Sequence, residues 1–236
     1  MPVDNERVQK MLARLRESDL GASGVAVALQ RVVDSACAVF EVTGTGLMFM
    51  DDEQVLRYIA ASDDPGRVLE VAQEEHGVGP CVDALINDVV VTVNDMEHDE
   101  RYSAIAPVIV PKGVRAVLGI PVHIGGASVG SLNAYCNEPI EWDESTRDAL
   151  STFGSLIETI VASALLTERH SHVVEQLEYA LRNRVTIERA VGIIMERERT
   201  DAVSAFNRLR NEARSKRRKV AELAQEQLDR FAIPSS

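Results

Sequence analysis

Six cationic residues are gathered within eleven positions near the C-terminus, where the chain reads RNEARSKRRKV from 210 to 220. They are Arg210, Arg214, Lys216, Arg217, Arg218 and Lys219. Arginine can bind two phosphate oxygens at once through its planar guanidinium group, and lysine offers a point charge to the same oxygens. The cluster therefore favours contact with a nucleic-acid backbone. A solvated helix face is the alternative, although such a face more often interleaves glutamate among its cations.

The charge of the whole chain makes this cluster unusual. The 236 residues carry a formal net charge of −12, yet residues 1–170 hold 12 Lys and Arg against 27 Asp and Glu, whereas residues 171–236 hold 13 against 10. Such an asymmetry predicts two parts with different partners, of which only the second attracts nucleic acid. No aromatic residue lies among the cations, so we expect contact through phosphates and a few loop-base edges rather than base stacking.

Other residues that could do chemistry are sparse. His76, His98 and His123 have no metal-ligand spacing, and the chain has no Gly-rich loop before a Lys and no nucleophile elbow, so we expect neither a metal site nor catalysis. Cys81 follows Pro80 at a turn into a helix, where a thiol pKa can be lowered. We interpret Cys81 as a small buried residue, with a reactive thiol as the alternative. Three widely spaced cysteines are typical of a reducing cytoplasm.

The elements expected to position these residues begin with alternating helical and strand-like stretches. Helical spacing occurs within 1–20, 25–39 and 67–75, and strand-like runs occur at 45–50, 55–62, 89–95, 114–124 and 128–136. The Gly125-Gly126 pair between the last two runs indicates an antiparallel hairpin. This order predicts an α+β fold in which helices cover an antiparallel sheet.

After Trp142 the sequence predicts only helices. Apolar residues three and four apart form a seam at Leu150, Phe153, Ile157, Ile160 and Ala164, and a second seam runs from Val173 to Ile194. We interpret residues 143–199 as one long helix that pairs with a second copy in a homodimeric coiled coil. Two consecutive helices of a monomer are the alternative. Two short amphipathic helices follow, the first with Thr200 as its expected N-cap, and the cationic cluster lies where they join.

The stretch ALRNRVTIERAVGIIMERERTDAVSAFNRLRNEARSKRRKVAELA resembles an ANTAR domain, the RNA-binding module of bacterial antitermination regulators. The positions that carry the resemblance are Ala180-Leu181, Arg184, Ile187, Ala190, Gly192, Met195, Ala205-Phe206, Leu209-Arg210, Arg218-Lys219, Val220 and Ala224. It spans nearly all of residues 175–230 and implies a three-helix, usually dimeric module that holds paired RNA hairpins and prevents terminator formation. It also implies that Arg184 contacts RNA. Two positions depart from the family pattern: Val191 stands where the family usually has Lys, and Arg217 stands where it often has Asn. The resemblance implies that this Lys and this Asn contact loop bases.

The segments EEHGVGPCVDAL, VTVNDMEHDERY and GVRAVLGIPVHIGGASVGSLNAYCNEP resemble a GAF domain, particularly those that precede ANTAR domains in actinobacteria. The positions that carry it are Gly77-Val-Gly-Pro80, Asp95, Gly113-Val114, Pro121 and Gly130-Ser-Leu-Asn133, within a match over roughly 20–166. GAF domains are sensory modules with a ligand pocket on one side of an antiparallel sheet, so the resemblance implies a place for a ligand but not its identity. The candidate lining residues are Tyr58, Cys81, Asp95, Tyr102 and Asn133.

Together these patterns predict a regulator in three segments. Residues 1–20 form an N-terminal helical segment, 21–166 a GAF sensor domain and 167–233 an ANTAR domain that holds hairpin RNA as a homodimer. The chain has no run of about 18 apolar residues and no secretory signal, so we expect a cytoplasmic protein without a membrane span. A helical scaffold that binds another protein is the first alternative, and a thiol redox enzyme centred on Cys81 is the second.

Overall fold

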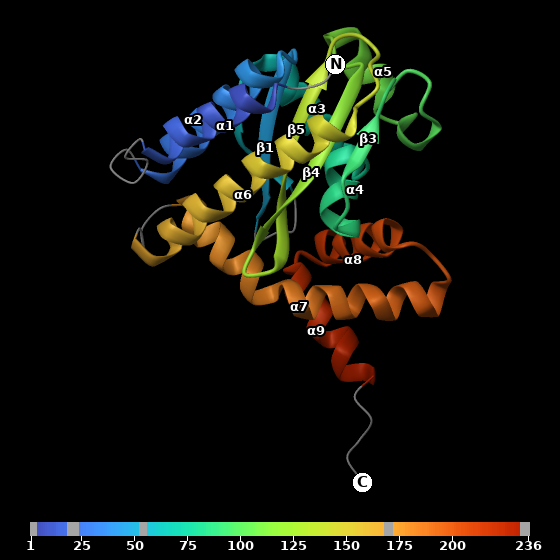
Figure 1. The fold of residues 1–236 in the computed structure, drawn as a ribbon. Coiled ribbons are helices and arrows are strands. Elements are labelled where there is room, and N and C mark those ends of the chain that lie inside the picture. The colour runs from blue at the N-terminus through green and yellow to red at the C-terminus, as the bar shows by residue number, and fades with distance from the viewer. Residues whose placement is uncertain (1–3, 18–23, 52–55, 168–171, 232–236) are drawn as a thin grey trace.

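The computed structural model describes residues 4–17, 24–51, 56–167 and 172–231 (Figure 1). An antiparallel sheet of five strands lies in the first part of this chain, in the order β2-β1-β5-β4-β3. The strands are β1 (Gly44–Met50), β2 (Leu56–Ala61), β3 (Val91–Val93), β4 (Ala116–Ile124) and β5 (Ala127–Cys136). Gly125 and Gly126 both adopt positive φ angles between β4 and β5, as a two-residue hairpin turn of this kind requires. The predicted hairpin is therefore confirmed.

Helices cover both faces of the sheet. One face packs against α1 (Asn5–Glu17), α2 (Val25–Phe40) and α6 (Glu144–Thr167). On the other face, α3 (Asp64–His76) contacts β1 and β2, and α4 (Pro80–Asn87) contacts β3, β4 and β5. α5 (Ala106–Ile109) packs against α3, and the 3-10 turns η1 (Glu100–Tyr102) and η2 (Val110–Lys112) contribute to the same apolar core. All seven residues of β1 are buried because both of its faces are covered, which explains why that strand is almost continuously apolar.

Three further helices form the second part of the chain: α7 (His172–Glu198), α8 (Ala202–Lys216) and α9 (Val220–Phe231). Asp201, not the expected Thr200, caps α8, because its side chain accepts a hydrogen bond from the Ser204 backbone N–H at 2.9 Å. The predicted α+β architecture, a sheet domain followed by a three-helix unit, is confirmed. The three helices lie directly below α4 and the lower end of the sheet (Figure 1).

The stretch predicted as one long helix is two elements. α6 ends at Thr167, α7 begins at His172, and the two helices run in different directions (Figure 1). Residues 168–171, between these two helices, lie outside the described residues. Leu150, Phe153 and Ile157 of the predicted seam are fully buried against the sheet and α2 of the same chain. This seam is therefore not available to pair with a second copy in the described arrangement.

The stretch Glu144–Leu166 within α6 is long and apolar enough to cross a bilayer when length and composition alone are considered. The same stretch supplies Phe153, Ile157 and Val161 to the core of the sheet domain, where each is fully buried. Burial of this kind is what a core helix of a globular domain shows.

Candidate nucleic-acid interface

The junction of α8 and α9 exposes most of the cationic cluster. Ala205, Leu209 and Ala213 of α8 pack against α7 and α9, which turns the polar side of the junction outward. Five of the six cations of the cluster are exposed there, namely Arg214, Lys216, Arg217, Arg218 and Lys219. The apolar spacing of the two short helices therefore positions these cations at the surface.

Local acidic partners hold part of this charge. Lys216 Nζ lies 2.6 Å from Glu212 Oε1, and Arg218 Nη1 lies 2.6 Å from Glu226 Oε2. Lys219 lies over the ring of Tyr179, with 4.8 Å between Nζ and the ring centroid. Ion pairs this exposed contribute little to stability, so phosphate groups can replace the carboxylates at low cost. Among the described residues, the side chains of Arg214 and Arg217 have no ion-pair partner.

Arg217 ends α8 in the left-handed conformation, with φ 52° and ψ 42°. Its backbone N–H donates to the carbonyl oxygens of Ala213 and Arg214, as a C-terminal helix cap does. Asparagine adopts this conformation more readily than arginine. The Asn that the resembled family often has at this position would therefore adopt the cap conformation with less strain. Arg217 has more strain at this position but adds one positive charge.

The other two predicted RNA-binding residues lie beneath the sheet domain. Arg184 is only 8% exposed, and its Nε donates to Glu188 Oε1 at 2.6 Å while Nη2 reaches the carbonyl oxygen of Leu85 at 3.5 Å. Arg210 is partly buried against α3 and α4, where it shares a small gap with Glu74 and Val82. The structure thus separates the seven cations into five on an open surface and two at the seam between the domains.

The candidate ligand-lining residues of the sheet domain do not form one group. Tyr58 is 44% exposed on β2, whereas Tyr102 is buried and its hydroxyl donates to Asp83 Oδ2 at 2.7 Å. Burial and this hydrogen bond raise the pKa of the Tyr102 hydroxyl well above its usual value. Asn133 lies beside Gly119, opposite the residue that precedes Cys81: a Cβ at Gly119 would be 3.2 Å from the Pro80 carbonyl oxygen and 3.6 Å from Asn133 Oδ1.

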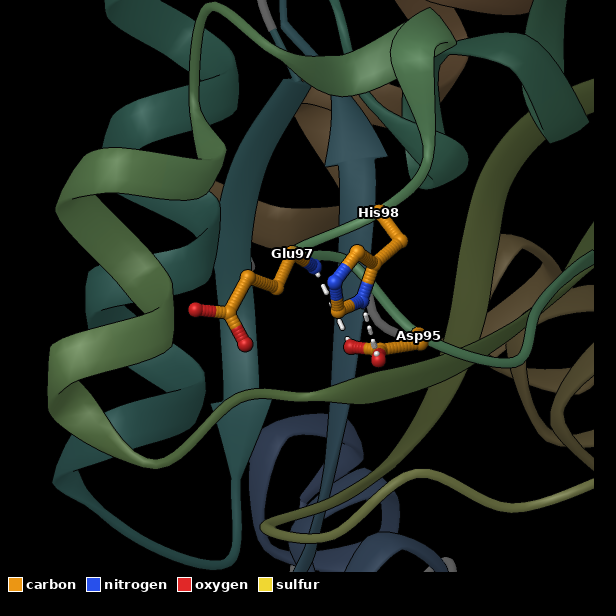
Figure 2. Close-up of side chains that lie close together, drawn as sticks. All are labelled: Asp95, Glu97 and His98. Carbon is orange, nitrogen blue, oxygen red and sulfur yellow. Dashed lines mark hydrogen bonds and ion pairs between the residues drawn. The ribbon is translucent and has the colours of Figure 1, made fainter.

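Asp95 lies in an exposed loop beside Glu97 and His98, and side-chain atoms of the three lie within 4.8 Å of one another (Figure 2). The Arg115 guanidinium donates to both Asp95 carboxylate oxygens at 2.9 Å and also pairs with Glu97. These bonds, with one from His98 at 2.8 Å, lower the pKa of Asp95 far below its usual range. A guanidinium already occupies the position that a cation would take, so the arrangement is that of a loop ion-pair network.

The sequence patterns missed two polar residues in the core, Glu70 and Gln73 of α3. Gln73 is fully buried and binds Cys81 twice, accepting from its backbone N–H and donating to its Sγ, both at 2.9 Å. Glu70 is 3% exposed, and its Oε2 has no partner among the described residues. Burial raises the pKa of Glu70 well above its usual value. Their spacing of three places them on the helix face of Leu69 and Ala72, which is the signal that marks them.

Burial also decides the chemistry of Cys81. Its side chain is fully buried, and this burial raises the thiol pKa strongly, although the hydrogen bond from Gln73 opposes the change. The thiol stays protonated at neutral pH, whereas nucleophilic or redox chemistry needs the thiolate. The interpretation of Cys81 as a buried residue that fills space therefore agrees with its surroundings.

Structural comparisons show the fold of the sheet domain. The GAF domain of a phosphoenolpyruvate-protein phosphotransferase from Acinetobacter superposes with a TM-score of 0.55 at 15% identity, covering 70% of this chain and 96% of that chain. The corresponding domain from Coxiella burnetii gives 0.54 at 17% identity, over 67% and 92%. A free methionine-R-sulfoxide reductase from Neisseria meningitidis gives 0.52 at 15% identity, over 66% and 86%. Likeness at such identities concerns the fold alone.

Sequence comparisons identify both parts of the chain. No curated protein is significantly similar in sequence to the chain. The sequence profile of the GAF domain matches residues 25–161, which is more than half of the chain, and the profile of the ANTAR domain matches residues 175–226. The first match contains the five-stranded sheet and the second contains the exposed cations of the α8–α9 junction. The chain therefore belongs to the GAF domain family and carries an ANTAR domain after its GAF domain.

Proposed function

We propose that this chain is a cytoplasmic RNA-binding regulator of transcription antitermination, in which the GAF domain senses a ligand or a partner and controls hairpin binding by the ANTAR domain. The observation that carries the proposal is the set of five exposed cations at the α8–α9 junction, inside the segment that matches the ANTAR profile. An otherwise acidic chain presents positive charge to the solvent at this junction, where phosphates can reach it.

The action on RNA follows from the chemistry of these side chains. Arginine and lysine at the junction bind phosphates and fix the position of an RNA hairpin, whereas sequence information comes from contacts with loop bases. Arg214 and Arg217 can bind a phosphate without first breaking an ion pair. Lys216 and Arg218 must first release the glutamate carboxylates with which they pair. A hairpin held in this way cannot pair into the competing terminator stem.

The proposal is tested by measuring hairpin binding as a function of salt. The probe is a labelled pool of RNA stem-loops with randomised loop sequences, because the target is not identified. If about four cations contact phosphates, log affinity falls with log salt at a slope near −3, taking the coefficient for single strands. A protein-binding helical scaffold is the first alternative, and it predicts no hairpin binding and a partner interface that depends little on salt.

We propose further that the chain is not an enzyme. A thiol redox enzyme is the second alternative, because the fold is shared with a methionine sulfoxide reductase. The protonated and fully buried Cys81 opposes that activity. Incubation with peroxide or with free methionine sulfoxide, in the presence of a thiol reductant, is expected to give no turnover.

The homodimer stays a prediction. Two ANTAR domains in one particle would gain affinity for paired hairpins through effective concentration. Leu150, Phe153 and Ile157 of the first predicted seam are buried within the chain, so a dimer would have to use other residues than these. Light scattering at micromolar concentration measures the mass directly, and a single-chain mass would contradict the prediction.

A further inference from the structure

The GAF and ANTAR domains share one apolar core. On the GAF side it contains Met48, Met50, Leu56, Cys81, Val82 and Leu85. On the ANTAR side it contains residues of all three helices, among them Ile187, Val191 and Phe206, and Phe206 is only 3% exposed. α8 contacts α4, and α7 contacts β1 and β5. The ANTAR domain is thus docked on the same face of the sheet that α3 and α4 cover, rather than held at a distance from it (Figure 1).

A polar contact sets the position of α8 on this face. Asn207 Nδ2 donates to the carbonyl oxygen of Gly77 at 2.6 Å. Gly77 ends α3 with φ 68°, and a Cβ at this position would lie 2.4 Å from Arg210 Nη2 and 2.8 Å from Asn207 Oδ1. A side chain at this position would displace the ends of Asn207 and Arg210, and glycine adopts this backbone conformation without strain.

The GAF domain also presents acidic groups to Arg210. The pKa of Arg210 is lowered overall, mainly by burial and then by the neighbouring charge of Arg214. The negative charges of Glu74 and Asp51 oppose this change. Arg57 bridges the same two carboxylates and holds them in place. In the docked arrangement the negative charges near Arg210 therefore come from the GAF domain, whereas in a complex with RNA they would come from phosphate oxygens.

We propose that the docked arrangement is a state in which RNA binding is suppressed, because the GAF domain covers one edge of the RNA-binding surface. The covered side chains are Arg184, Arg210 and Asn207, and α8 must leave the α3–α4 face before Arg210 can reach a phosphate. The inference rests on the proposed function, since it assumes that RNA is the ligand of the ANTAR domain. A signal that loosens the α3–α4 face would then release α8 and raise the affinity for RNA.

A reversible cross-link tests docking and its effect on RNA. The full-length chain carries Gly77→Cys and Asn207→Cys in a background of Cys37→Ser and Cys136→Ser. A Cβ at Gly77 lies 3.3 Å from Asn207 Cγ, whose position the sulfur of a cysteine at 207 can take, so the two cysteine side chains are expected to meet. Oxidation is expected to form an intramolecular disulfide, and the oxidised protein is expected to bind the stem-loop pool at least about tenfold more weakly than the same protein after reduction. Each single-cysteine variant, treated with the same oxidant, is the control.

An opened variant tests the same inference without a cross-link. Gly77→Asn keeps a residue that tolerates a positive φ but pushes a side chain into Asn207 and Arg210, and Glu74→Lys repels Arg210. The matched control combines Gly125→Asn, which also has positive φ but meets open space, with Glu75→Lys on an exposed position of the same helix. Both double variants have the same net charge. The opened variant is expected to bind the pool about tenfold more tightly than the control, as it would if about a tenth of the molecules were open before the change.

The outcomes separate this inference from the proposed function. If no disulfide forms in the folded protein, the docking itself is refuted. If the disulfide forms and the oxidised and reduced proteins bind RNA equally, docking is real and suppression is wrong. If neither the reduced protein nor the opened variant binds any stem-loop, the proposed function fails and the suppression fails with it, while the disulfide yield still reports the docking.

Discussion

The side-chain amide of Gln73 holds Cys81 at two points, since its Oε1 accepts from the Cys81 backbone N–H and its Nε2 donates to Sγ, both at 2.9 Å. This pair of bonds joins the end of α3 to the start of α4. It also anchors the thiol in a fully buried position, where no solvent reaches it.

Cys81 is therefore expected to resist alkylation in the folded protein. Iodoacetamide at neutral pH should modify it only as fast as the domain unfolds, because the thiol is buried and its pKa is raised. Cys37 and Cys136, which are partly exposed, are expected to react sooner. Peptide mass spectrometry over a time course measures the three rates, and rapid labelling of Cys81 would revive the thiol-enzyme alternative.

Glu70 is expected to make stability fall as pH rises. Its pKa in the fold is raised above the unfolded value, so the folded state holds the proton more tightly and loses this advantage as pH rises from the unfolded pKa towards the folded one. Glu70→Gln should therefore raise the free energy of unfolding by about 1 kcal/mol or more at pH 7.5, with little difference near pH 4.

Urea unfolding at several pH values measures this difference. Glu75→Gln, at an exposed position of the same helix, is the control and should leave the pH dependence unchanged. A Glu70→Gln variant that is less stable than the parent protein at pH 7.5 would mean that the ionised carboxylate has a partner.

Arg217→Gly is expected to stabilise the ANTAR domain by about 1 kcal/mol, because arginine at a positive φ carries a cost that glycine avoids. Arg214→Gly is the matched control, since Arg214 lies within the last turn of α8 and glycine there should destabilise by up to about 1 kcal/mol. Both variants lose one cation. Thermal unfolding followed by circular dichroism distinguishes them, and equal destabilisation by both would exclude a cap role for position 217.

Replacing Arg217, Arg218 and Lys219 by Ala is expected to weaken binding to all stem-loops alike and to reduce the steepness of the salt dependence by about 2 in slope. The control removes three cations from exposed positions of the GAF domain, Arg31, Arg67 and Lys112, so that the net charge changes equally. Salt titrations of both variants, with circular dichroism as the folding check, give the comparison. An unchanged slope in a folded triple variant would reduce the cluster to a solvated helix face.

Ile157→Asp is expected to unfold the GAF domain. The side chain is fully buried inside the chain, and an unpaired carboxylate there should cost more than about 3 kcal/mol. Thr159→Asp, at an exposed position two residues away on α6, should be tolerated. Circular dichroism measures whether the variant is folded, and light scattering measures its mass. If Ile157→Asp turned a dimeric protein into a folded monomer, Ile157 would belong to a dimer seam and not to the core.

Several features were determined by the sequence alone. Alternation of apolar residues and a Gly-Gly pair were enough to predict β4, β5 and their hairpin, because a two-residue turn with positive φ admits few other residues. The charge asymmetry located the exposed cations, and the joint spacing within two segments identified both domains. These properties are local, because they depend only on residues close together in the sequence.

What covers each apolar face was decided only by the tertiary structure. The spacing of Leu150, Phe153 and Ile157 shows that α6 has an apolar side, but the hydrophobic effect is not directional, and a second chain or the protein's own sheet would satisfy that side equally. The same holds for Phe206, which packs against the GAF domain and brings Arg210 and Asn207 with it. Thr200 and Asp201 are both good caps, and only the path of the backbone into α8 selects Asp201. Contacts between residues far apart in the chain settle each of these choices.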